Sequence, residues 1–286
     1  MANPLSYREQ ITHARLPVVL GAALLMAVAV LYAEIPFLSL LSIACISLGS
    51  LLIHSIYTFN SWTDFNEDLV NSPEFASAGT RARSKVLALS LASGTASIII
   101  SVFFGVLSFA TVSFMLVMGL MYSYPVLGRL GMPRFKEIPV FKNVVAALMW
   151  SVMLTLPFSA SEILPGMLVI LLILFVFLQI LIESISRDLP DMRGDRGAGF
   201  STIPSAMGLR KTLLLLLAVN TASVAVISAC ATMAPYTSLI LMGCAWRYYV
   251  LLLLFGDRPL SLTFAKVNFP TLLALVVGAV MGKLFM

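Results

Sequence analysis

The chain has 286 residues, of which 60% are hydrophobic and 11% are charged, and its mean hydropathy is +1.00. Soluble domains carry about 25% charged residues, so this composition excludes a water-soluble globular fold. The net charge of +5 does not indicate a nucleic-acid partner, because positive residues beside apolar segments are the usual feature of cytoplasmic loops that face anionic lipid.

Apolar runs of about 20 residues recur along the chain, and a helix of that length crosses about 30 Å of hydrocarbon. Pro and Gly stand at the breaks, where a helix is expected to stop. We therefore predict an all-α polytopic membrane bundle of about nine transmembrane helices, forming a single membrane domain over residues 1–286. The predicted spans are 16–33, 36–58, 86–104, 106–124, 139–158, 165–182, 212–232, 236–255 and 267–286.

The 18 Lys and Arg residues indicate the orientation of these spans. The connections after the first, third, fifth and seventh spans contain none of them, whereas the segment before the first span and the long even-numbered loops are rich in them. By the positive-inside rule, the N-terminus and the even-numbered loops are predicted to lie in the cytoplasm.

The 13 acidic residues are distributed just as unevenly. Four directly follow the second span and four more lie around the end of the sixth, so the two clusters are four spans apart and have the same orientation. This pattern suggests an internal duplication, with spans one to four and spans five to eight as the two copies. The clusters consist of Asp64, Glu67, Asp68 and Glu74, and of Glu183, Asp188, Asp191 and Asp195.

In the first cluster, Asn60, Asp64 and Asp68 are spaced by four residues. On a helix this spacing places their side chains along one stripe. Two carboxylates stacked in this way repel each other unless a cation lies between them, so the spacing favours a metal site.

In the second cluster, Asp191 and Asp195 are again four residues apart, and Asp188 comes one turn earlier. Pro190 and the glycines that follow predict that the helix ends within this motif. We expect the segment to form a bent cap over a site.

Carboxylate oxygens at a membrane edge suit Mg²⁺, which typically binds one or two carboxylates, several waters and substrate phosphates. Two such clusters on one face predict a clamp for a diphosphate, in which charge on the departing group is neutralised by Mg²⁺ and by basic side chains from the intervening loops. Solvated loop acids are the simpler alternative for one cluster alone, and Ca²⁺ is another, although the usual calcium-loop pattern is absent. The predicted metal ligands are Asp64, Asp68, Asp191 and Asp195, which with Asn60 form the predicted catalytic set.

These motifs resemble those of the UbiA superfamily of intramembrane prenyltransferases. Asn60, Asp64 and Asp68 fall on that family's NxxxDxxxD motif, and the residues from Asp188 to Gly199 are similar to its DxxDxxGDxxxG segment. The rest of the resemblance lies in Asn71-Ser-Pro73, in Thr202-Ile-Pro204, in Tyr122-Ser-Tyr-Pro125, and in the basic residues of Arg134-Phe-Lys136 and Lys142-Asn143.

The resemblance implies a helical bundle whose apolar cavity is capped by the two acidic loops, in which a Mg²⁺-bound isoprenyl diphosphate ionises and alkylates a lipophilic acceptor, either an aromatic ring or an alcohol. Some members are terpene cyclases, so a cyclase is the alternative; a transporter would place its ionisable groups nearer the bilayer midplane. Two departures concern Ser61, where many members have Asp, and the absence of Arg-Pro after Pro73. The residues predicted to contact the substrate are Tyr122, Arg134, Lys136, Asp188 and Arg196.

Overall fold

The computed structural model describes residues 15–65, 79–126, 128, 131–190, 192, 201–255 and 264–285, apart from the side chains of residues 79–82 and 264–269. The part of the chain that it describes is helical and contains no strand. The elements are α2 (Leu16–Tyr32), α3 (Leu40–Thr63), α5 (Gly79–Phe103), α6 (Val106–Ser123), η3 (Phe135–Glu137), α7 (Pro139–Met153), α8 (Leu156–Ala160), α9 (Met167–Arg187), α11 (Ile203–Met207), α12 (Leu209–Met233), η4 (Pro235–Leu239), α13 (Ile240–Phe255) and α14 (Phe264–Leu284).

Most of the predicted spans fall on one of these helices, whereas span 139–158 covers α7 and α8, and span 236–255 covers η4 and α13. Within the described ranges, seven helical segments are long and apolar enough to cross a membrane, and two shorter apolar helices, Leu16–Tyr32 and Pro270–Leu284, coincide with the first and last predicted spans. The prediction of an all-α polytopic bundle is therefore confirmed, and the protein is an integral membrane protein.

The chain divides into two compact units, Met1–Arg134 with Met153–Ile163, and Phe135–Val152 with Leu164–Met286. The main boundary falls between the fourth and fifth predicted spans. The internal duplication itself stays a prediction.

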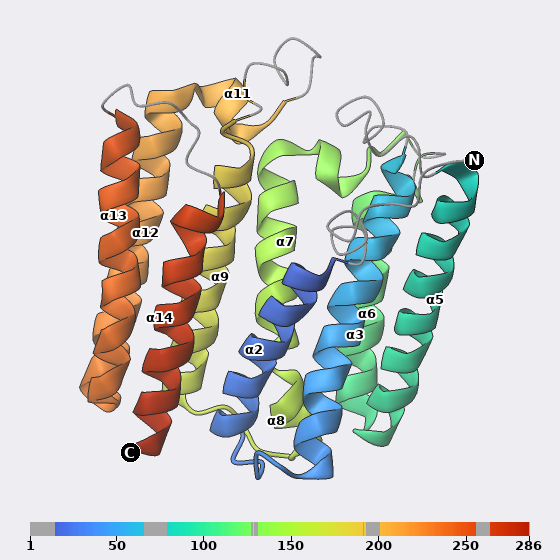
Figure 1. The fold of residues 1–286 in the computed structure, drawn as a ribbon, viewed down its shortest axis with the longest axis horizontal. Coiled ribbons are helices and arrows are strands. Elements are labelled where there is room, and N and C mark those ends of the chain that lie inside the picture. Colours follow the sequence, from blue (N-terminus) through green and yellow to red (C-terminus); the bar gives the residue numbers. More distant parts are fainter. Residues whose placement is uncertain are drawn as a thin grey trace. The chain divides into compact units, whose positions relative to one another are not determined.

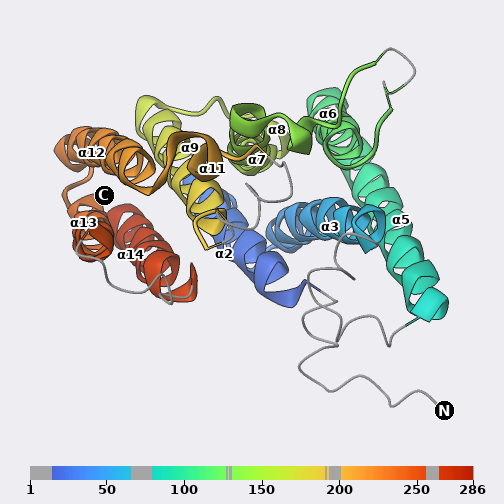
Figure 2. The same ribbon diagram turned by 90° about the horizontal axis from the view of Figure 1, so that it is seen from above.

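In the first unit, α3 lies between α2 and α5 (Figures 1 and 2) and packs against both of them and against α6 and α8. Its contact with α5 is polar: the hydroxyl of Ser55 donates to the carbonyl oxygen of Ser90 at 2.8 Å, and the hydroxyl of Ser90 donates to the carbonyl oxygen of Ser55 at 2.9 Å. His54 Nδ1 lies 2.7 Å from Ser93 Oγ. Small hydroxyl residues allow close helix packing in lipid, where apolar side chains gain nothing by leaving the solvent.

In the second unit, α12 packs on α9 and α13, and α13 packs on α14 (Figure 1). A Cβ atom added at Gly243 of α13 would lie 2.8 Å from Thr271 Cα of α14, so only glycine permits this approach. Near the C-terminal end of α9, a buried apolar cluster that includes Ile185, Leu213 and Leu251 joins α9, α11, α12 and α13. The first unit thus packs α3 closely against its neighbours, and the second unit does the same for α9. These are the two helices whose C-terminal ends carry the acidic motifs.

Candidate functional site

The acidic motif after the second span begins in a hydrogen-bonded group at the end of α3, which we name the α3-end cluster: Asn60, Asp64, Ser123 and Arg134. Asn60 Nδ2 donates to Asp64 Oδ2 at 2.9 Å, and Ser123 Oγ, at the end of α6, donates to Asn60 Oδ1 at 2.9 Å. Ser123 is fully buried, and its hydrogen bond to Oδ1 orients the Asn60 amide so that the N–H of Nδ2 faces the Asp64 carboxylate. The predicted four-residue stripe is confirmed for Asn60 and Asp64.

Asp64 is the C-cap residue of α3, and its backbone N–H donates to Asn60 O at 2.9 Å. Its side chain is only 14% exposed, and Arg134 Nη1 lies 3.9 Å from Oδ1. Thr63 Oγ1 also donates to Oδ1 at 3.2 Å. The carboxylate is thus fixed in direction by an amide and a hydroxyl, with a guanidinium beside it.

Two further arginines that were not among the predicted site residues lie on the same end of α3. Arg15, the N-cap residue of α2, donates from Nε and Nη2 to Ser61 Oγ at 2.9 and 2.6 Å. The Arg83 guanidinium lies over the rings of Trp62 and Phe65, 5.3 and 5.4 Å from their centroids. The end of α3 therefore carries positive charge from three separate segments, which suits a polyanionic ligand.

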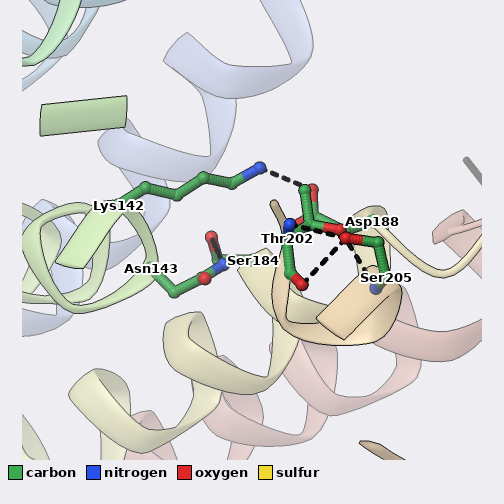
Figure 3. Close-up of polar contacts among 6 residues, drawn as sticks. All are labelled: Lys142, Asn143, Ser184, Asp188, Thr202 and Ser205. Carbon is green, nitrogen blue, oxygen red and sulfur yellow. Dashed lines mark hydrogen bonds and ion pairs between the residues drawn. The ribbon is translucent and has the colours of Figure 1, made fainter. Parts of the chain in front are cut away.

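The second acidic motif begins in what we name the α9-end clamp: Lys142, Asn143, Ser184 and Asp188. Lys142 Nζ, on α7, donates to Asp188 Oδ1 at 2.8 Å, and Asn143 Nδ2 donates to Ser184 Oγ at 2.8 Å (Figure 3). Ser184 and Asp188 lie one turn apart on α9, so two adjacent residues of α7 hold two successive turns of one face. Sequence reasoning left all but Asp188 out of the predicted site, because no spacing rule links residues 40 positions apart.

Asp188 is also the C-cap residue of α9, so the helix ends within the motif, as predicted. Thr202 begins the short helix α11 with a capping box: Ser205 N donates to Thr202 Oγ1 at 3.3 Å, and Thr202 N donates to Ser205 Oγ at 2.7 Å (Figure 3). Pro204 stands in the first turn of α11, where its missing N–H costs nothing. The Thr-Ile-Pro segment is thus a helix start.

The other predicted residues are placed as follows. Tyr122 is half-buried in the last turn of α6, and Lys136 is half-buried in η3 of the second unit. Asp68, Asp191, Asp195 and Arg196 lie outside the described residues.

The donor chemistry of the α3-end cluster fits Mg²⁺. Asp64 offers carboxylate oxygens, and no thiol or imidazole is among its hydrogen-bonding partners in this cluster. Mg²⁺ needs only one or two protein carboxylates beside water and phosphate oxygens. Among the described residues, no three His, Cys, Asp or Glu side chains come together.

A polytopic helical bundle with arginines and a directed carboxylate at a helix end defines an integral membrane protein with a charged polar site at the end of a membrane helix. The chain belongs to the UbiA prenyltransferase family, whose model matches residues 16–281. A search of curated proteins found no match.

Solved structures share the fold. A UbiA homologue from Archaeoglobus fulgidus bound to GPP and Mg²⁺ has 16% identity and a TM-score of 0.73, with 96% of this chain and 98% of that chain covered. The apo UbiA homologue from Aeropyrum pernix K1 has 16% identity and a TM-score of 0.72, with 92% and 96% covered. A digeranylgeranylglyceryl phosphate synthase has 16% identity and a TM-score of 0.69, with 94% and 97% covered.

We expect Ser123→Ala to weaken the binding of Mn²⁺, a spectroscopic substitute for Mg²⁺, about tenfold, because it frees the amide that orients Asp64. Electron paramagnetic resonance of free Mn²⁺ measures this affinity. The matched control is Ser97→Ala, whose hydroxyl donates only within its own helix, to the carbonyl oxygens of Ser93 and Gly94. Equal affinities in the two variants would contradict a role for Ser123.

Lys142→Met should lower the free energy of unfolding by about 2 kcal/mol, because it leaves a mostly buried carboxylate without this charged donor. Thermal unfolding in detergent measures the loss. Adding Asp188→Leu should restore most of it, since both charged partners are then gone. The control is Arg187→Met, which breaks a pair with Glu183 in which Arg187 is 46% exposed and should cost about 0.5 kcal/mol or less; a similar cost for both single variants would refute the clamp.

Proposed function

We propose that this protein ionises an isoprenyl diphosphate in a Mg²⁺-dependent reaction and transfers the prenyl group to a lipophilic acceptor, an aromatic ring or an alcohol, within the membrane. The observation that carries the proposal is the α3-end cluster, in which a partly buried amide and carboxylate pair lies beside arginines at the end of a membrane helix. Membership of the UbiA prenyltransferase family supports the reaction class.

Homologous structures support the substrate class. Those from Archaeoglobus fulgidus are bound to GPP and Mg²⁺ or to DMAPP and Mg²⁺. We infer that the present chain binds the same kind of allylic diphosphate through Asn60, Asp64, Asp68, Asp191 and Asp195, with Tyr122, Arg134, Lys136 and Arg196 contacting the substrate.

In this proposal, the bound Mg²⁺ supplies neutralising charge for the diphosphate as it leaves. The chain's own residues have separate roles. Asn60 and Ser123 orient the Asp64 carboxylate, and Arg134 adds positive charge where the leaving group accumulates negative charge. The Tyr122 ring, in the last turn of α6, shields the allylic cation through its π face.

Asp188 has a different role in the proposal from Asp191 and Asp195. Its Oδ1 accepts from Lys142 at 2.8 Å, which neutralises the carboxylate and fixes the C-cap of α9. We therefore assign Asp191 and Asp195 as the ligands on this loop and Asp188 as the residue that holds its base.

The placement of charge also supports a cytoplasmic site. The connections without Lys or Arg all lie on the opposite side of the predicted topology. We propose that the N-terminus and both acidic loops face the cytoplasm. There Mg²⁺ can bind from aqueous solution and diphosphate can be released into it.

Incubation of the purified protein with Mg²⁺ and farnesyl or geranylgeranyl diphosphate, without any acceptor, tests the reaction type. We expect little product until an aromatic or alcohol acceptor is added, and loss of all turnover when EDTA removes the metal. A cyclic hydrocarbon formed without acceptor would identify a terpene cyclase and overturn the transferase proposal.

We expect Asp64→Ala and Asp191→Ala each to reduce diphosphate release at least about a hundredfold, because each removes a carboxylate from the metal site. Release of diphosphate from farnesyl diphosphate measures the rate, and thermal unfolding checks that the variants fold. The control is Glu162→Ala, on a connection of the opposite predicted face. Normal rates in both Asp variants would rule out the metal assignment.

A further inference from the structure

One arginine lies inside the helical bundle, away from the acidic motifs. Arg247 is only 1% exposed and belongs to the apolar segment Pro235–Phe255. It stands eight residues before the end of α13 at Phe255, which is about 12 Å along the helix axis. A charged side chain at this depth is costly in a membrane and usually marks a functional position with a specific partner.

That partner is on α9. Arg247 Nη1 donates to Gln179 Oε1, and Gln179 is 7% exposed. Gln179 also stands eight residues before the end of its helix, at Arg187, and α9 and α13 end on the same side of the unit (Figure 1). The two side chains therefore meet at equal depth and tie the two helices together in a defined register.

The amide of Gln179 is directed by this bond. Its Nε2 has no hydrogen-bond acceptor among the described residues, so the interaction with the guanidinium is what orients the amide. Arginine has only donors, which fixes the carbonyl oxygen of Gln179 toward α13.

Gln179 begins a polar face that runs to the end of α9. Glu183 and Arg187 follow at four-residue intervals, which places all three on one stripe of the helix, and Arg187 Nη2 donates to Glu183 Oε1 at 2.6 Å. The neighbouring stripe carries Ser184 and Asp188, which the α9-end clamp holds from α7. The end of α9 is thus held from two directions, by α7 at its tip and by α13 two turns deeper.

Simple attachment of helices does not require a guanidinium. Elsewhere in this unit neutral groups suffice: Thr221 Oγ1 lies 2.5 Å from Tyr248 Oη, and Asn220 Nδ2 donates to Cys244 O at 3.1 Å. The guanidinium of Arg247 instead meets Gln179, the first residue of the face that leads to the acidic motif. A contact that served only to attach the two helices would not account for a charged residue at this position.

We propose that Arg247 is a positioning residue: by holding Gln179, it sets the rotation of α9 and so the direction in which the acidic loop leaves the helix at Asp188. This inference rests on the proposed function, because the loop is taken to bind Mg²⁺ and diphosphate. It concerns a residue about 12 Å along α13 from the end of that helix, which is not among the proposed metal ligands or substrate contacts.

The test compares Arg247→Met and Gln179→Leu, which remove the donor and the acceptor, with the exchanged pair Gln179→Arg/Arg247→Gln. The matched control is Thr221→Val, which removes the contact with Tyr248 between α12 and α13 and leaves α9 alone. Two quantities are measured in nanodiscs: hydrogen exchange of the backbone amides of residues 184–189, and the Mg²⁺ concentration that half-saturates diphosphate release from farnesyl diphosphate.

We expect faster exchange at the end of α9 and a roughly tenfold higher half-saturating Mg²⁺ concentration in both single variants. The exchanged pair should restore both quantities, and Thr221→Val should change neither. If Arg247→Met does not fold, Gln179→Leu decides by the same criteria.

Three results would overturn the inference: unchanged exchange in the single variants, faster exchange with unchanged Mg²⁺ dependence, or an exchanged pair that restores neither quantity. The first result would show that α13 does not hold the end of α9. The second would show that the pair serves only in helix packing. The third would show that the effect does not depend on the pairing of Arg247 with Gln179. If the unmodified protein releases no diphosphate, the proposed function fails; the exchange data then decide whether Arg247 holds the end of α9.

Discussion

Inside a bilayer no water is available to satisfy backbone or side-chain polar groups, so every such group must find its partner within the protein. This constraint explains why the described chain is helical throughout and why its interhelical contacts are made by hydroxyls and amides. The reciprocal bonds of Ser55 and Ser90 in one unit, and the bond of Asn220 to a carbonyl of α13 in the other, follow from it. Helix positions are therefore specified by polar pairs as well as by shape.

The same constraint explains where charge is found. Asp64 and Asp188 both stand at helix ends, where the membrane gives way to water, and each is held by a donor from a different segment. A carboxylate that is proposed to bind a hard cation, as Asp64 is, must be accessible to the ligand and yet fixed in direction. The C-cap of a packed helix gives Asp64 both, whereas at Asp188 the same position lets Lys142 hold the end of α9.

Most of the fold could be predicted, because hydropathy, Pro and Gly report directly on helices in lipid. The contact between Asn60 and Asp64 could also be predicted, since the two residues are one helical turn apart and local spacing is all that their contact needs. Ser123, Lys142 and Ser184 could not, because their partners lie 40 or more positions away in the chain. The partner of Arg247 is 68 positions away, and an arginine within an apolar run looks the same in sequence whether its side chain reaches toward lipid headgroups or faces the bundle interior.

The sequence by itself determined the class of protein, the approximate number of helices and the two acidic motifs, because each depends on composition or on spacing within one helix. Only the tertiary structure decided which donor meets which carboxylate. It paired Asp188 with Lys142, directed Asp64 through Asn60 and Ser123, and placed Arg247 against Gln179 in the interior. The physical reason is that a side chain's partner depends on how helices pack, and packing is a property of the whole unit rather than of any local pattern.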